Sequence, residues 1–269
     1  MIGGFFKGQK MSEKKREIIE IEEVSSKPAE ALVVGGLVRF TTIDFPGSLA
    51  AVAFIQGCPW RCVYCQNKEL QSRRPDAETD QVSWAYIERF LSRRKGLIDG
   101  FVFSGGEPCV DPALSDAAKR VKALGYKVGL HTGGMYPARL AEILPYLDWV
   151  GLDIKAPLSE EETYDRVVGR KGSAQKVRKS LSLLLASGVA LETRTTAHPD
   201  YLSEAQIVKL VKELKEAGVR TFALQIYRQP RELPEEEVLE RVGTHYPNPQ
   251  ALDELKALYP DFILRRPQL

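Results

Sequence analysis

The strongest constraint on the fold is a pattern that recurs along the chain: a short apolar run rich in β-branched residues, a polar or glycine-rich turn, and then an amphipathic stretch. This order is typical of repeated βα units. Right-handed crossovers between parallel strands curl a sheet one way, so the pattern predicts an α/β fold and favours a barrel or partial barrel, here a partial (β/α)6 TIM-like barrel, over the alternative of an open doubly wound sheet. The six predicted strands are Ala50 to Ile55, Gly100 to Phe103, Lys127 to His131, Trp149 to Ile154, Leu191 to Thr196 and Thr221 to Tyr227.

Two of the amphipathic stretches carry explicit helix signals. Asp111 is predicted as the N-cap of a helix with Pro112 at its first position, ending at Gly125. Ser203 begins a second helix, where Gln206 completes a capping-box pattern and Gly218 marks the end. Both helices would cover the predicted parallel sheet.

The chain of 269 residues divides into two parts by composition. Residues 1–30 contain many Lys and Glu without helical or strand periodicity, which predicts a flexible N-terminal extension. Residues 31–269 would form a single domain with a C-terminal tail from about residue 230, whose stretch 251–258 has a helical pattern. The length alone suits one large domain or two small ones.

Composition excludes several classes of protein. A formal net charge of +2 gives no support for nucleic-acid binding, and 43% hydrophobic with 28% charged residues is ordinary for a globular protein. The longest apolar stretches, 31–38 and 49–55, are too short to cross a membrane. Residues 1–10 do not have the pattern of a secretory signal, so we expect a cytoplasmic protein without a membrane or nucleic-acid partner.

Three of the four cysteines lie together directly after the first predicted strand. Cys58, Cys62 and Cys65 have the spacing C-x3-C-x2-C on one predicted loop. Three soft thiolates on one loop can hold an iron–sulfur cluster or form part of a zinc site, and the remaining interpretation is a set of small buried residues. A fourth ligand would have to come from elsewhere, with Cys109, His131, His198 and His245 as the candidates.

A glycine-rich turn follows the second predicted strand. Gly105 and Gly106 would let the backbone approach a ligand closely, and Glu107 could accept a hydrogen bond from an ammonium group. Because ligands of parallel α/β folds bind at the carboxyl ends of the strands, this turn and the cysteine loop should share one site.

The two motifs together resemble those of the radical S-adenosylmethionine (SAM) enzymes, over about residues 35–227. Within that family the chain is most similar to the activating enzymes of glycyl-radical enzymes, above all to those of anaerobic ribonucleoside-triphosphate reductase. The segments that carry the closer likeness are 42–47 (TIDFPG), 153–157 (DIKAP) and 194–196 (RTT).

The resemblance implies a role for each matching residue. Cys58, Cys62 and Cys65 would ligate three irons of a 4Fe-4S cluster, whose fourth iron would bind SAM. The other residues of the SAM site would be Tyr64 near the adenine, Gly105, Gly106 and Glu107 at the methionine amino group, Asp153 and Lys155 at the ribose hydroxyls and carboxylate, and Arg194 as a second carboxylate contact.

Two positions depart from the pattern of these activating enzymes. Where they often read Asp-Thr-Asn-Gly, this chain has His131, Thr132, Gly133 and Gly134, so a cation site there loses its carboxylate. We keep His131 as a candidate site residue. The alternative is a structural histidine whose hydrogen bonds are made locally at the end of the strand. Cys109 is predicted as a small buried residue, with a redox-sensitive thiol as the alternative.

The implied activity is that of a radical SAM oxidoreductase. The reduced cluster would cleave SAM to a 5′-deoxyadenosyl radical, which would take a hydrogen from a glycine of a partner glycyl-radical enzyme. A flavodoxin- or ferredoxin-type protein would supply the electron. The alternatives left open are a radical SAM enzyme acting on a small molecule or peptide, and a non-catalytic metal-binding module.

Overall fold

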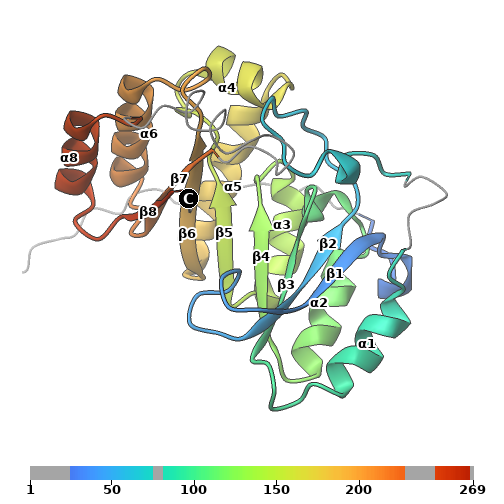
Figure 1. The fold of residues 1–269 in the computed structure, drawn as a ribbon. Coiled ribbons are helices and arrows are strands. Elements are labelled where there is room, and N and C mark those ends of the chain that lie inside the picture. The colour runs from blue at the N-terminus through green and yellow to red at the C-terminus, as the bar shows by residue number, and fades with distance from the viewer. Residues whose placement is uncertain (1–24, 75–80, 228–245, 267–269) are drawn as a thin grey trace, which may run out of the picture.

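The computed structural model describes residues 25–74, 81–227 and 246–266 (Figure 1). Its centre is one eight-stranded sheet in the order β1 to β8. The strands are β1 (Val34–Thr41), β2 (Ala50–Ile55), β3 (Gly100–Gly105), β4 (Lys127–Thr132), β5 (Trp149–Asp153), β6 (Ala190–Ala197), β7 (Phe222–Ile226) and β8 (Ile263–Arg265). The α-helices are α1 (Trp84–Ser92), α2 (Leu114–Ala123), α3 (Pro137–Ile143), α4 (Glu161–Val168), α5 (Ser173–Ser187), α6 (Glu204–Glu216) and α8 (Pro249–Leu258).

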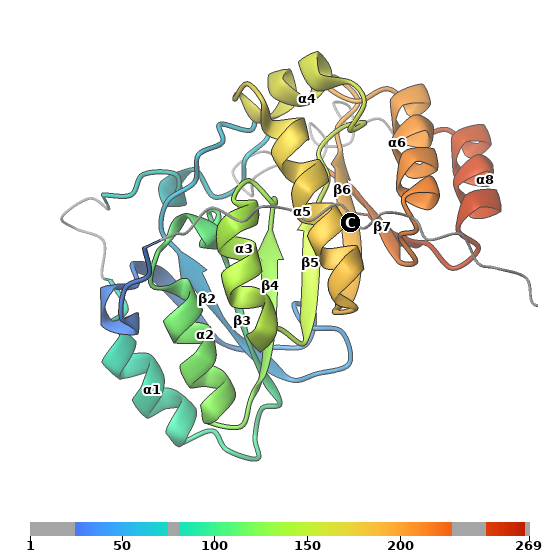
Figure 2. The same ribbon diagram turned by 180° about the vertical axis from the view of Figure 1, so that it is seen from behind.

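The sheet forms a partial barrel, as the sequence predicts. Strand β1 pairs antiparallel with β2, and each later neighbouring pair is parallel. Figure 2 shows α1, α2, α3 and α5 in front of the sheet, whereas the opposite face in Figure 1 carries none of them. Within the described residues β1 and β8 remain the two edges of the sheet, so the barrel is open on one side.

The six predicted strands correspond to β2 through β7, whereas β1 and β8 are additional. Strand β1 contains Gly35 and Gly36 and β8 has only three residues, so neither has the periodicity of the six. The predicted helical pattern at 251–258 is confirmed as α8. Residues 1–24 of the predicted extension and 228–245 of the tail lie outside the described residues, while Ala29 is buried in a short 3-10 helix (Ala29–Ala31).

One of the two predicted helix caps is confirmed and the other is wrong. Ser203 and Gln206 form the complete capping box of α6. Helix α2 begins at Leu114, because the buried carboxylate of Asp111 has other partners. The Asp111 carboxylate accepts hydrogen bonds from the N–H groups of Val33 and Ala113. It also forms an ion pair with Arg73 at 2.9 Å. Asp111 therefore ties three segments together instead of capping a helix.

The amino end of the barrel interior is filled by a small cluster of apolar side chains that includes Phe45 and Trp149. Phe45, from the loop between β1 and β2, stacks on Trp149 with ring centroids 5.8 Å apart. The inward position of β3 facing it is Gly100, where a Cβ would lie 2.9 Å from the Phe45 ring. This packing closes one end of the barrel, so an interior ligand must bind at the carboxyl ends of the strands.

Candidate active site

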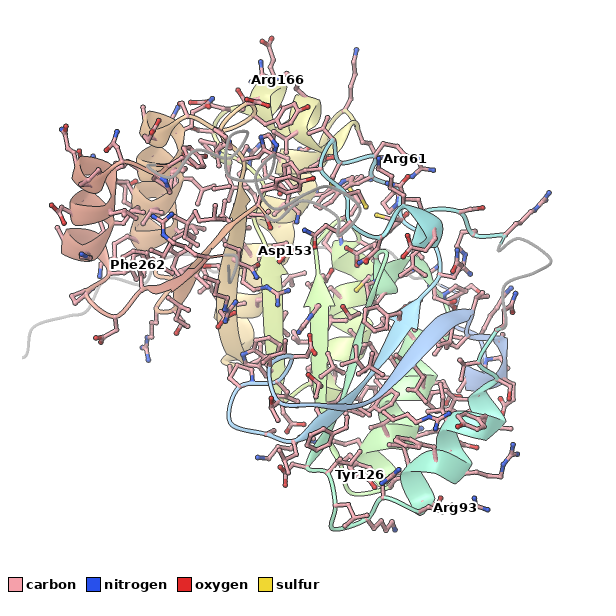
Figure 3. All side chains as sticks on the ribbon, in the orientation of Figure 1. Arg61, Arg93, Tyr126, Asp153, Arg166 and Phe262 are labelled. Carbon is pink, nitrogen blue, oxygen red and sulfur yellow. The ribbon has the colours of Figure 1, made fainter. Side chains whose placement is uncertain are left out.

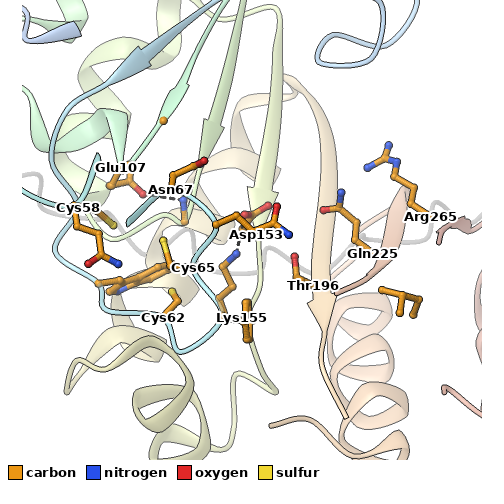
Figure 4. Close-up of a pocket in the computed structure, with 18 of the residues that line it drawn as sticks. Cys58, Cys62, Cys65, Asn67, Glu107, Asp153, Lys155, Thr196, Gln225 and Arg265 are labelled. Carbon is orange, nitrogen blue, oxygen red and sulfur yellow. Dashed lines mark hydrogen bonds and ion pairs between the residues drawn. The ribbon is translucent and has the colours of Figure 1, made fainter. Parts of the chain in front are cut away.

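A pocket of about 420 Å³ opens at the carboxyl ends of the strands (Figure 4). It is lined by residues from the loop after β2 and from the ends of β3 and β5 to β8. Nine of the eleven predicted site residues line it, and these are Cys58, Cys62, Tyr64, Cys65, Gly105, Gly106, Glu107, Asp153 and Lys155. His131 and Arg194 are not among the lining residues.

The cysteine loop is anchored through its backbone on two sides. The N–H of Cys58 donates to Gln71 O at 3.0 Å, and the N–H of Arg61 donates to Val168 O at the end of α4 at 2.8 Å. Trp60 donates its indole N–H to Ser173 Oγ at 3.1 Å. The loop is thereby fixed in a conformation that turns three thiols toward one pocket.

Burial favours the neutral form of two of these thiols, Cys58 and Cys62, in the chain alone. Removal from water, followed by the negative charge of Glu107, raises the pKa of Cys58 to about 12, and burial also raises the pKa of Cys62. A thiolate here therefore needs a cation, which is the condition a metal centre supplies.

The donor set fits a 4Fe-4S cluster better than a structural zinc ion. Closed zinc sites take four ligands, and the pocket lining contains three cysteines and no histidine. Among the described residues, no three His, Cys, Asp or Glu side chains converge on a single ion. A cluster places each thiolate on a different iron, so it does not require that convergence. Three cysteines leave one iron open to another ligand.

Cys109 does not join the other cysteines. It lies in a 3-10 helix (Pro108–Val110) and is 1% exposed, with its Sγ 4.0 Å from Thr132 Oγ1. Its prediction as a small buried residue is confirmed.

The Gly-Gly-Glu turn holds the ends of β3 and β4 together. Glu107 is 1% exposed and accepts hydrogen bonds from Thr132 Oγ1 at 2.7 Å and from the N–H of Gly133 at 2.8 Å. Burial raises the pKa of Glu107, and these hydrogen bonds oppose that change. The carboxylate thus already has protein partners, which makes the Gly105 and Gly106 backbone the more accessible part of the turn for a ligand.

Gly106 is required by close packing. A Cβ at this position would overlap the carbonyl oxygen of Gly57 and lie 2.8 Å from that of Leu70. The next residue, Glu107, donates its N–H to Gly57 O at 2.8 Å. The turn after β3 and the cysteine loop therefore contact each other directly through their backbones.

Asp153 and Lys155 form a partly buried ion pair at the end of β5. Lys155 Nζ lies 2.9 Å from Asp153 Oδ2, and Arg194 Nε lies 3.0 Å from Asp153 Oδ1. Burial acts to raise the pKa of Asp153, but the two cations outweigh it and hold that pKa well below its usual range. Arg194 also donates to Gly151 O at 3.4 Å. Its guanidinium thus orients Asp153, and the predicted contact of Arg194 with a SAM carboxylate stays a prediction.

His131 is not part of the pocket wall. Its Nε2 is 2.8 Å from the carbonyl oxygen of Asp44, which requires an N–H on that nitrogen, and its Nδ1 is 3.4 Å from Ser104 Oγ. Burial, with the nearby Arg194 charge, lowers the pKa of His131 to about 3. A neutral histidine therefore connects β4 to the loop after β1, and its predicted role in a cofactor site stays a prediction.

Tyr64 belongs to an aromatic group at one side of the pocket. Its ring stacks on His198 with centroids 6.3 Å apart, and Tyr201 and Tyr227 pack around both. The Tyr64 side chain is buried and its Oη has no hydrogen-bond partner among the described residues. A planar ligand with polar edges would suit this position.

The far wall of the pocket consists of residues that no sequence motif marks. Thr196, Gln225 and Arg265 line it from β6, β7 and β8. They come from segments separated by up to 69 residues and share no motif, so only strand register brings them together. Figure 4 shows them in that order, with Lys155 between them and the cysteines.

This fold and site define a barrel protein with a three-cysteine metal centre and a ligand pocket at its strand ends. The model of the Radical SAM superfamily matches residues 52–201, more than half of the chain. The chain belongs to the Radical SAM superfamily, whose members use a 4Fe-4S cluster and S-adenosylmethionine, and Cys58, Cys62 and Cys65 lie where the cluster ligands are expected.

Two sequence relatives and one solved structure extend this comparison. A Methanocaldococcus jannaschii protein, named provisionally as a glycyl-radical enzyme activating enzyme, is 28% identical over 76% of this chain and 83% of its own length. The pyruvate formate-lyase-activating enzyme of Clostridium pasteurianum is 32% identical over 48% of this chain, and the match spans about half (53%) of that relative. QueE from Escherichia coli shares the fold with a TM-score of 0.53, at 16% identity, over 88% of this chain and 94% of that one.

The described residues contain no helix that is long and apolar enough to cross a membrane.

Proposed function

We propose that this protein activates a glycyl-radical enzyme, and that its partner is an anaerobic ribonucleoside-triphosphate reductase. The observation that carries the proposal is the position of the pocket, which extends from the three cysteines to β8, an edge strand of the sheet within the described residues. A glycine inside a folded partner can reach a radical source only if the barrel admits a protein segment from the side. The two relatives reported above have names that point to the same activity.

The chain's residues would divide the work as follows. Cys58, Cys62 and Cys65 would hold three irons of the cluster, and the Gly105–Gly106 backbone with Asp153 and Lys155 would hold SAM beside the fourth. With an electron from a flavodoxin- or ferredoxin-type donor, the bound cofactors would supply a 5′-deoxyadenosyl radical, with methionine as the leaving group, and this radical would take a hydrogen atom from the partner's glycine. Tyr64 would pack against the adenine, and the buried walls would keep water from the reacting atoms.

The experiment is to form the partner radical directly. The protein is reconstituted with iron and sulfide without oxygen, reduced, and mixed with SAM and a candidate reductase made with glycine deuterated at Cα. We expect a glycyl radical signal in the paramagnetic resonance spectrum and deuterium in the 5′-deoxyadenosine. If 5′-deoxyadenosine forms but neither the signal nor the deuterium appears with this reductase or with other glycyl-radical enzymes, the activating function is wrong. A small molecule or peptide would then be the better candidate substrate.

A further inference from the structure

Three inward-facing side chains form a row across the last three strands of the barrel. Thr196 of β6 pairs in register with Gln225 of β7, and Gln225 pairs with Arg265 of β8. Because paired residues of neighbouring strands point to the same face, all three side chains project into the pocket that they line. We call these residues the β6–β8 row.

We propose that the β6–β8 row binds the main chain of an extended protein segment that carries the glycine to be oxidised. This inference rests on the proposed function, and it adds the part of the site that recognises the macromolecular substrate.

The first two members of the row are free to bind a ligand. Among the described residues, the Thr196 hydroxyl and the Gln225 carboxamide have no side-chain hydrogen-bond partner, although both residues lie at the pocket wall. A hydroxyl and a carboxamide can each donate and accept. Unpaired polar groups in a partly buried wall are stabilised by a ligand that offers both hydrogen-bond donors and hydrogen-bond acceptors.

The third member is held in place by a buried carboxylate. Arg265 contacts both oxygens of Glu192, with its Nη1 and Nη2 at 3.0 and 3.1 Å from Oε1 and Nη2 at 3.1 Å from Oε2. The Glu192 side chain is 4% exposed, whereas that of Arg265 is 36% exposed. A guanidinium has five N–H donors, so Arg265 keeps donors for a carbonyl oxygen after this pairing.

The chemistry of the row matches a peptide better than an anionic metabolite. A carboxylate or phosphate only accepts hydrogen bonds. The acceptor oxygens of Thr196 and Gln225 would then have no donor to bind. An extended main chain presents N–H and C=O groups alternately at about 3.3 Å per residue. Neighbouring strands lie about 4.8 Å apart, so the row spans about 10 Å, or about three extended residues.

The position of the row also suits a segment entering from outside. One end lies next to Lys155 on the cofactor side, and the other lies on β8, the open edge of the sheet (Figures 1 and 4). A segment lying along the row would cross β8 and bring its next residue toward the cysteines. Glycine suits that residue because it has no Cβ to keep the backbone away from the cofactors.

The test measures peptide binding apart from chemistry. The probe is a fluorescent, capped Ala-Ala-Gly-Ala-Ala peptide, titrated into the reconstituted full-length protein with SAM present and without reductant. The Gln225→Leu and Thr196→Val substitutions remove hydrogen-bonding atoms at nearly constant volume. Each should weaken binding about fivefold to tenfold. Gln250→Leu, which makes the same change at an exposed position of α8, is the matched control and should bind like the native protein.

A second peptide tests main-chain recognition. N-methylation of the two amides flanking the glycine removes donors without changing any side chain, and it should weaken binding by a similar factor. The inference is overturned if the native protein does not bind the parent peptide, if Gln225→Leu and Thr196→Val bind it as tightly as Gln250→Leu, or if methylation has no effect.

The proposed function is judged by a separate measurement. After reduction, deuterium from a Cα-deuterated glycine in the partner protein either appears in 5′-deoxyadenosine or does not. Deuterium transfer with unchanged peptide binding in Gln225→Leu would reject the β6–β8 row and keep the activating function. Weakened binding without deuterium transfer from any glycyl-radical enzyme to 5′-deoxyadenosine would keep the row as a peptide site and reject that function.

Discussion

Lys155 Nζ and Asp153 Oδ2 lie 2.9 Å apart at the end of β5, and this ion pair is held within the wall of the pocket. Figure 3 shows Asp153 near the middle of the molecule. Because Arg194 binds the other carboxylate oxygen, one negative charge organises two cations that would otherwise repel each other. The geometry of the SAM side of the pocket therefore depends on Asp153.

The substitution Asp153→Asn should weaken both folding and SAM binding. It leaves Lys155 and Arg194, whose side chains are 12% and 11% exposed, without a counter-charge, and we expect a loss of about 2 kcal/mol in the free energy of unfolding. Denaturant unfolding and equilibrium binding of SAM measure the two effects. Asp253→Asn removes a similar charge from an exposed pair on α8 and should change stability by less than about 0.5 kcal/mol. Equal effects of the two variants would show that the pair at β5 does not have this role.

The burial of His131 makes stability depend on pH. Its pKa is about 3 in the folded chain and about 6.5 when unfolded, so between these values the unfolded state binds more protons. Stability is therefore complete above pH 6.5 and falls as the pH is lowered, by about 1–2 kcal/mol between pH 7 and pH 5. The charged groups near the ring are Arg194, Arg265 and Asp153.

The variant His131→Gln isolates this contribution. Glutamine keeps a donor for Asp44 O but does not titrate, so the difference in unfolding free energy between the native protein and the variant should shrink as the pH falls from 7 to 5. Because acid damage to a metal centre affects both proteins, the comparison cancels it. A constant difference across the pH range would mean that His131 is not buried as a neutral group.

Gly106 should tolerate no side chain. In Gly106→Ala the new Cβ meets the backbone of Gly57 and Leu70, which cannot move without displacing the cysteine loop. We expect poor retention of iron, measured per chain after reconstitution, and a lower melting temperature. Gly36→Ala is the matched control, because a Cβ there meets no atom within 4 Å, and it should retain iron like the native protein. Full iron content in Gly106→Ala would contradict the contact between the two motifs.

The Glu192–Arg265 ion pair should affect stability mainly because its Glu192 carboxylate is buried. Arg265→Gln leaves the Glu192 carboxylate without its partner, and we expect the unfolding free energy to fall by about 2 kcal/mol. The double variant Glu192→Gln with Arg265→Gln removes the stranded charge and should recover part of that loss. If the double variant loses more unfolding free energy than the two single variants lose together, the Glu192–Arg265 ion pair does not stabilise this wall of the pocket.

Much of the fold could be predicted because it depends on local patterns. Strands β2 to β5 and β7 are mainly apolar runs and β6 is rich in β-branched threonine, and the helices that follow have clear end signals; this pattern is typical of buried parallel strands. Strand β1 was missed because it is an antiparallel edge strand with two adjacent glycines, and β8 because three residues carry no periodicity. Asp111 was misassigned because its long-range partners Val33 and Arg73 outweigh its local preference for a helix N-cap.

The site was predictable where its residues share a motif. The cysteine loop and the Gly-Gly-Glu turn are each contiguous, so spacing alone identifies them. Residue type suggested Arg194 as a ligand contact, but its orientation is decided by Asp153 on the neighbouring strand. Thr196, Gln225 and Arg265 meet only through strand register, which no short segment of sequence contains.

The central claim is that the three pocket cysteines hold the metal centre at which SAM is cleaved. The most direct measurement is the amount of 5′-deoxyadenosine formed per chain by the anaerobically reconstituted and reduced protein. We predict product with the native protein and with Cys109→Ala, in which the buried fourth cysteine is removed, and none with Cys58→Ser, Cys62→Ser or Cys65→Ser. No product from the native protein, or undiminished product from any of the three serine variants, would contradict the account.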